Sequence, residues 1–246
     1  MAKIKNALIS LSDKENLRFV LQTLKKNKIN IISSGGTYRS IKKLGFKCKE
    51  VSQYTGFEEM LDGRVKTLHP KIHSGILFKR DNKIHKKQMQ KKQFEPIDLV
   101  IVNFYPFETV IRKTSNKKKI IENIDIGGPS MVRAAAKNFE SVTVITDKKD
   151  YSELIKELKK LKGKTTFNFR KKMASKAYGL TAYYDAIVSE WFNKDIGLNF
   201  PERKTFFGKK ISQLRYGENP HQKSSIYINS LKNDDINLQQ LSGKEL

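Results

Sequence analysis

The sequence contains a single cysteine, Cys48, and no long uninterrupted hydrophobic run. One cysteine excludes an internal disulfide and a metal site built from cysteines, and it suits a reducing compartment. The longest apolar run, 97–107, includes Asp98 and Asn103, and it is about half the length that spans a bilayer. The apolar stretch near the N-terminus is too short for the core of a signal peptide. We therefore expect a soluble, cytoplasmic protein without a membrane partner.

Acidic residues are also scarce: 25 Asp and Glu stand against 49 Lys and Arg, which gives a formal net charge of +24. Such a charge suggests a nucleic-acid-binding protein. However, only nine of the 49 basic residues are arginine, the residue best suited to recognise bases and phosphates in a bidentate way. The sequence also lacks a zinc finger, an RNP-like motif and an interleaving of aromatic and basic residues. The lysine excess indicates a compositional bias, and we expect no nucleic-acid partner.

Short apolar runs alternate with segments of helical periodicity. We predict strands in the runs 7–9, 29–32, 48–51, 97–103 and 141–145. Helices are predicted to follow Ser12, Ser34 and Pro129 and to occupy 151–161 and 167–192, and Ser12 and Glu15 have the spacing of a capping box. This alternation favours an α/β fold with a parallel sheet and helices on both faces. Ligands bind such sheets beyond the carboxyl ends of the strands.

The composition changes near Asn193, and the segment 214–222 is rich in turn-forming residues. The residues after this segment are too few to form a core of their own. We therefore expect one domain over residues 1–196, and over 197–246 a linker and an incomplete second domain.

The segment Ser34-Gly35-Gly36-Thr37 lies between a predicted strand and a predicted helix. Two glycines allow backbone amides to face a ligand, and a helix N-terminus attracts an anion. Lys14 is expected to stand beside this loop in a parallel sheet. The segment therefore suggests a phosphate site, although an ordinary turn explains the same residues.

The segment from Gly63 to Pro70 places Arg64, Lys66 and Thr67 within four residues. If the segment is extended, its alternation puts Arg64 and Lys66 on one side, where both could bind an oxyanion. A basic surface loop is the alternative. His69 and His73 have the i, i+4 spacing of a metal pair. Because Pro70 interrupts a regular helix there and no third ligand is evident, we favour structural roles and expect no metal.

Two further segments come after a predicted strand or before a predicted helix. Asn103 and Tyr105 come at the end of the clearest strand, where they suit hydrogen bonding to a heterocycle or simple aromatic packing. Asp125 precedes Gly127-Gly128 and a helix that carries Arg133 and Lys137 four residues apart. A buried set of Tyr, Asp and Lys side chains can transfer protons, because burial and pairing shift their pKa values.

Taken together, these motifs resemble the N-terminal part of the bifunctional purine-biosynthesis family that combines AICAR transformylase with IMP cyclohydrolase. The resemblance extends from the first strand almost to the C-terminus. It rests on these stretches: 10–14, 34–37, 55–70, 103–107, 125–128, 133–138 and 214–222. The second and third are highly specific in combination.

The resemblance implies a methylglyoxal-synthase-like fold for 1–196 and the closure of formyl-AICAR to inosine monophosphate, without a metal or cofactor. Its proton-transfer residues would be Lys66, Tyr105, Asp125 and Lys137. Its purine-nucleotide-binding residues would be Ser12, Lys14, Ser34, Gly35, Gly36, Thr37, Arg64, Lys66, Thr67, Asn103, Asp125, Ile126, Gly127 and Gly128.

Residues from about 200 onward resemble the start of the transformylase domain, in which Arg215 and Tyr216 match AICAR-binding positions. The catalytic Lys-His motif of that domain is absent from this sequence. We expect this chain not to transfer a formyl group, whereas a longer protein would do so from 10-formyltetrahydrofolate as a homodimer.

Three other functions fit parts of the sequence. Methylglyoxal synthase shares the implied fold, but the set of nucleotide-sized loops argues against it. A non-catalytic nucleotide-sensing module is the main alternative, and the joint presence of Lys66, Tyr105, Asp125 and Lys137 favours catalysis over it. A nucleic-acid-binding protein is suggested by the charge alone.

Overall fold

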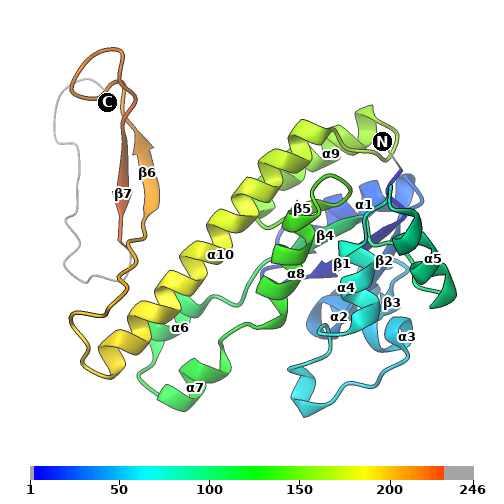
Figure 1. Ribbon diagram of the computed structural model, residues 1–246, viewed down its shortest axis with the longest axis horizontal. Coiled ribbons are helices and arrows are strands. Elements are labelled where there is room, and N and C mark those ends of the chain that lie inside the picture. Colours follow the sequence, from blue (N-terminus) through cyan, green and yellow to red (C-terminus); the bar gives the residue numbers. More distant parts are fainter. Residues whose placement is uncertain (1–2, 230–246) are drawn as a thin grey trace. The chain divides into compact units, whose positions relative to one another are not determined.

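The computed structural model describes residues 3–229, and its elements run in the order shown in Figure 1. By their internal contacts the residues form two units, Met1–Thr181 and Ala182–Leu246. This division falls inside the last helix and before residue 196. The assignment of residues 1–196 to one functional domain remains a prediction, and residues 230–246 of the expected second domain lie outside the described residues.

The first unit contains a five-stranded sheet in the order β3-β2-β1-β4-β5, and all four pairings are parallel. This confirms the predicted α/β class and all five predicted strands. Their bounds are β1 Asn6–Ser10, β2 Asn30–Ser33, β3 Lys49–Glu50, β4 Leu99–Val102 and β5 Thr143–Ile145.

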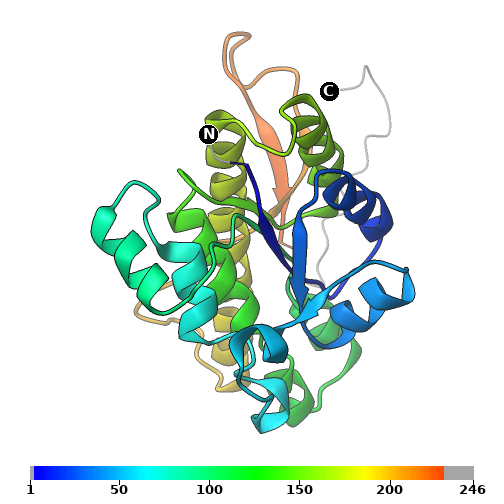
Figure 2. The same cartoon turned by 90° about the vertical axis from the view of Figure 1, so that its right-hand side faces the viewer.

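Helices lie on both sides of the sheet, as Figure 2 shows. Right-handed crossovers put α1 and α2 on one face and α4 and α8 on the other, and α1 packs against α9 while α4 packs against α8. The helices are α1 Leu17–Lys26, α2 Gly35–Lys43, α3 Val51–Thr55, α4 Pro70–Leu77, α5 Lys83–Lys91, α6 Phe107–Lys113, α7 Lys117–Glu122, α8 Gly127–Lys137, α9 Tyr151–Lys160 and α10 Phe167–Asp195. Two 3₁₀ turns are η1 Leu61–Gly63 and η2 Lys148–Asp150.

In the first helix the structure confirms the predicted spacing of buried apolar residues but not the predicted N-terminal cap. Leu17, Val20, Leu21 and Leu24 are buried at the predicted helical spacing. The predicted capping box is wrong: α1 begins at Leu17, and its N-cap residue Asn16 has a left-handed backbone (φ 60°) without a side-chain capping bond. Residues 12–15 form a separate loop between β1 and α1 instead.

The strands form the centre of the core, because all four residues of β4 and the first four of β1 are buried. Cys48 directly precedes the short edge strand β3 and is partly buried. Burial raises the pKa of the Cys48 thiol to about 12. Within the described part of the chain, no helix combines the length and the apolar character needed to cross a bilayer.

The second unit contains a two-stranded antiparallel hairpin of β6 Lys209–Gln213 and β7 Ser225–Ile228. The turn-rich segment 214–222 connects the two strands, as its composition suggested. Arg215 and Tyr216 lie at the start of this connection and are exposed. The loop is closed by the Gly217 N–H, which donates to the Gln222 carbonyl at 2.9 Å.

Candidate functional site

The loops that come after β1, β2 and β4 meet at one edge of the sheet, because these three parallel strands are neighbours. The strand order reverses at β1: β2 and β3 extend the sheet on one side, β4 and β5 on the other. In parallel α/β sheets such a switch point opens a crevice at the carboxyl edge, where ligands bind. The segments 11–14, 34–37 and 103–105, each predicted to carry functional residues, all lie there.

The loop after β1 is held by two side chains that we expected to contact a ligand. The Asn103 carboxamide accepts the Ser12 N–H at 2.6 Å and the Asp13 N–H at 3.2 Å, and it donates to the Asp13 carbonyl at 2.8 Å. The buried Thr37 hydroxyl bonds both backbone groups of Leu11. In this structure both side chains shape the loop, and direct ligand contact by either of them remains a prediction.

Two amines flank the Gly35-Gly36 turn at the N-terminus of α2. A Cβ atom added to Gly35 would lie 3.2 Å from Lys66 Nζ, and one added to Gly36 would lie 4.0 Å from Lys14 Nζ. Gly35 also has a positive φ of 52°, which favours glycine. Lys14 Nζ donates to the Ser12 carbonyl at 3.2 Å. Positive side chains, a helix N-terminus and glycine backbone together create an environment suited to an anion.

The segment that carries Arg64 and Lys66 is a turn and not an extended strand. Leu61, Asp62 and Gly63 have positive φ values in succession, so the alternation that we expected does not apply. Arg64 instead pairs with Glu122 of α7, with Nε 3.3 Å from Oε1. Lys66 points to the Gly35 turn and pairs with Glu59 at 3.4 Å. The two basic residues therefore have different partners.

A second glycine turn lies at the start of α8. The Gly128 N–H donates to Asp125 Oδ1 at 2.8 Å, and the Tyr105 N–H also hydrogen-bonds this carboxylate. Burial raises the pKa of Asp125, while these two hydrogen bonds and the positive charge of Lys66 oppose the rise. A Cβ atom on Gly127 would lie 2.5 Å from Thr67 Oγ1. Asp125, Thr67 and Lys66 thus belong to one cluster.

Lys137 is not part of that cluster. It is the last residue of α8, whose N-terminal residue is Gly127, and it is exposed. At a rise of 1.5 Å per residue the two backbones are about 15 Å apart. Ile126, in contrast, occupies the N-cap position of α8 and exposes 58% of its surface beside Asp125.

The two histidines after this segment have structural surroundings. His69 is the N-cap of α4 and accepts the Lys71 N–H through Nδ1 at 3.0 Å. Pro70 therefore begins the helix and does not break it. His73 hydrogen-bonds the Thr67 backbone, and its Nε2 is buried without a partner. Across residues 3–229, no three His, Cys, Asp or Glu side chains gather closely enough to hold a metal ion.

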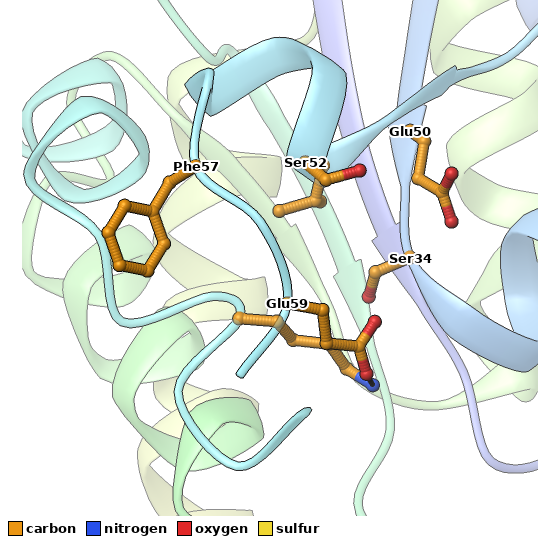
Figure 3. Close-up of a pocket in the computed structure, with 7 residues that line it drawn as sticks. Ser34, Glu50, Ser52, Phe57 and Glu59 are labelled. Atoms are coloured by element: carbon orange, nitrogen blue, oxygen red, sulfur yellow. Dashed lines mark hydrogen bonds and ion pairs between the residues drawn. The ribbon is translucent and has the colours of Figure 1, made fainter. Parts of the chain in front are cut away.

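A small pocket opens beside the Gly35 turn, where Figure 3 shows the Ser34 and Glu59 side chains pointing into the same space. Its lining residues are Ser34, Glu50, Val51, Ser52, Phe57, Glu59 and Lys66. Only Ser34 and Lys66 were predicted as site residues. Phe57 and Glu59 lie within the motif 55–70, and this motif was the available signal for them. Nothing in the sequence distinguished Glu50 or Ser52.

Comparison with known proteins gives two family matches and a consistent set of relatives. A model described as MGS-like domain matches residues 16–130, and one described as AICARFT/IMPCHase bienzyme matches residues 135–246. The bifunctional purine biosynthesis protein PurH of Bradyrhizobium diazoefficiens is 47% identical over 99% of this chain and 46% of its own length. PurH of Magnetococcus marinus is 48% identical over 100% of this chain and 48% of its own length.

The chain thus spans about half the length of the curated relatives that it matches. Among solved structures, the crystal structure of ForH matches with a TM-score of 0.69 and 31% identity, over 77% of this chain and 99% of that one.

Proposed function

This chain belongs to the AICARFT/IMPCHase bienzyme family, and from that premise we propose that residues 1–196 form an IMP cyclohydrolase. The reaction closes formyl-AICAR to inosine monophosphate with loss of one water. One observation carries the proposal: Lys14, Lys66 and the Asp125–Thr67 cluster surround two Gly-Gly turns at the carboxyl edge of the sheet. An anion site beside a buried titratable group suits the cyclisation of a phosphorylated substrate.

In this proposal the substrate phosphate binds at the N-terminus of α2. The ammonium groups of Lys14 and Lys66 neutralise its charge, and the amides of the Gly35-Gly36 turn donate to its oxygens. Binding of the phosphate releases Lys66 from Glu59 and draws Arg64 away from Glu122. The remaining proposed contacts are Ser12, Ser34, Thr37 and Thr67 on the phosphate side and Asn103 and Ile126 on the base or ribose side.

The chemical step requires two proton transfers. The carboxamide nitrogen attacks the formyl carbon, loses a proton as the new C–N bond forms, and the formyl oxygen becomes a hydroxyl group. The formamide nitrogen then loses its proton as a C=N bond forms and the hydroxyl group leaves as water. We assign the base role to Asp125, because its raised pKa brings a carboxylate closer to neutral working conditions.

The negative charge that develops on the formyl oxygen before it is protonated is stabilised by the Gly127 N–H and, over a longer range, by the positive charge of Lys66. The Gly128 N–H takes no part, because it is bonded to Asp125. The Tyr105 backbone N–H binds the Asp125 carboxylate. We propose the Tyr105 side chain as a further proton-transfer group beside Asp125 and Lys66. Because the phosphate anchors the substrate, the carboxamide and the formyl group are held close together, which lowers the entropic part of the activation barrier. The reaction uses no metal or cofactor in this scheme.

A catalytic role for Lys137 remains a separate prediction, since this residue lies at the far end of α8. Its test is the turnover of Lys137→Ala: a wild-type rate would reject the role.

The test of the function is to mix the purified chain with formyl-AICAR and monitor the absorbance of inosine monophosphate. We expect turnover by the wild type and a rate about 10²–10⁴-fold lower for Asp125→Asn. A folded sample that does not turn over contradicts the proposal. If that sample still binds inosine monophosphate, the nucleotide-sensing module is the better interpretation.

Properties of the full-length relatives are proposed only for a longer protein. They comprise formyl transfer from 10-formyltetrahydrofolate, AICAR contacts by Arg215 and Tyr216, a homodimer, and a cytoplasmic location.

A further inference from the structure

Lys148 connects two loops that are far apart in the sequence. It lies in η2, which follows β5 after two residues, and its Nζ is 2.9 Å from Asp13 Oδ2. The same ammonium group also pairs with Glu15. Since β4 stands between β1 and β5 in the sheet, the lysine reaches across the end of β4 to the loop after β1. We call this pair of contacts the Lys148 bridge.

The two carboxylates of the bridge flank Lys14, one of the two amines at the Gly35-Gly36 turn. Asp13 also folds the loop locally, because its Oδ1 accepts the Glu15 N–H at 2.9 Å. The next residue, Asn16, has φ 60°, a left-handed conformation that asparagine adopts more readily than most residues with a side chain. The Lys148 bridge adds side-chain contacts to this loop besides the backbone hydrogen bonds that Asn103 makes with Ser12 and Asp13.

We propose that Lys148 is a positioning residue of the anion site: by pairing with Asp13 and Glu15 it fixes the loop so that Lys14 faces the Gly36 turn. The inference rests on the proposed function of that site. It also explains why Asp13 and Glu15 lie beside a site for an anionic ligand, although their negative charges by themselves disfavour the binding of an anion.

That opposition gives a test in which the two explanations predict changes of opposite sign. If the only effect of Glu15 is the electrostatic repulsion between its carboxylate and the anionic ligand, Glu15→Gln removes that repulsion and tightens binding of inosine monophosphate. If it anchors the bridge, the same change frees the loop and weakens binding. Exposed ion pairs of this kind have modest energies, so we expect the dissociation constant to rise about two- to fivefold.

Lys148→Met and Lys149→Met form a matched pair, because both remove one positive charge from η2. Only Lys148 makes the bridge, whereas Lys149 is exposed. We expect Lys148→Met to raise the KM for formyl-AICAR about two- to fivefold with kcat retained, and Lys149→Met to match the wild type. Equal effects of the two variants, or tighter binding by Glu15→Gln, overturn the proposal.

A readout without nucleotide separates this inference from the proposed function. The Ser12 and Asp13 amides are bonded to Asn103, and loosening the loop should expose them. Their hydrogen exchange is expected to be faster in Lys148→Met than in Lys149→Met. If the wild type neither binds nor converts nucleotide, the cyclohydrolase proposal fails, and the exchange rates still decide whether the bridge fixes the loop. Unchanged exchange refutes the bridge.

Discussion

The Thr37 hydroxyl makes two hydrogen bonds to the backbone of Leu11: it accepts the N–H at 2.8 Å and donates to the carbonyl at 3.0 Å. Both residues are buried. One side chain of α2 therefore satisfies the backbone at the point where β1 has ended and the site loop begins. The loop needs this partner, because buried backbone groups without a hydrogen bond are costly.

We predict that Thr37→Val destabilises the fold. Valine has nearly the same shape but leaves the N–H and the carbonyl of Leu11 unpaired, which should lower the free energy of unfolding by about 1–3 kcal/mol. Thr37→Ser keeps the hydroxyl and is expected to lose much less. Urea unfolding of both variants measures the difference, and equal losses would show that the hydroxyl is unimportant.

The rate of the proposed reaction should depend on the titration of Asp125. A base works in its ionised form, and burial raises the pKa of this carboxyl. As the pH falls through that raised pKa, kcat/KM should decline at a higher pH than an exposed aspartate would give. Asp125→Asn should lower the rate by about 10²–10⁴-fold. A pH–rate profile of the wild type checks the first expectation, and a profile without an acid limb argues against Asp125 as the base.

Glu59 is predicted to compete with the substrate for Lys66, since its carboxylate lies 3.4 Å from that ammonium. Glu59→Gln removes the competing charge, so the KM should fall by about two- to fivefold while kcat stays close to the wild-type value. Glu58→Gln is the matched control, because it removes the same charge from the adjacent exposed residue. A similar KM for both variants would point to a general charge effect.

The stability of the protein should decrease on mild acidification because of His73. Burial lowers the pKa of this imidazole below its ordinary value of 6.5, so the unfolded chain takes up a proton before the folded one does. The stabilising contribution is complete above pH 6.5 and is lost as the pH falls toward the folded pKa. We expect His73→Phe to show a smaller loss between pH 7 and pH 5 than the wild type in urea unfolding. The same slope for both would contradict this account.

The strands were predictable because a buried parallel strand consists of a short, continuous run of apolar residues. Leu99–Val102 is apolar throughout, and the apolar run predicted it within three residues. Helix α10 was similarly evident over 167–192 against an observed range of Phe167–Asp195. The short helices α3 to α7 were missed, since each depends on packing more than on a long periodic pattern.

The site was predictable as a set of segments but not as a set of contacts. The sequence marked Asn103 as a hydrogen-bonding residue, yet its partners Ser12 and Asp13 are about ninety positions away. Arg64 likewise pairs with Glu122 across 58 positions. Lys148 carried no signal of its own, because it is one surface lysine among many. Only the folded chain determines which of several equivalent charges become neighbours.

The chemistry of Cys48 has a practical consequence. Thiol-directed reagents react with the thiolate, and a pKa near 12 leaves very little thiolate at neutral pH. Since this is the single cysteine of the sequence, a fluorophore or spin label attached to a cysteine introduced at an exposed position should modify that position almost alone. This chain thus allows specific labelling for spectroscopic probes near Glu59 or in η2 without prior removal of Cys48.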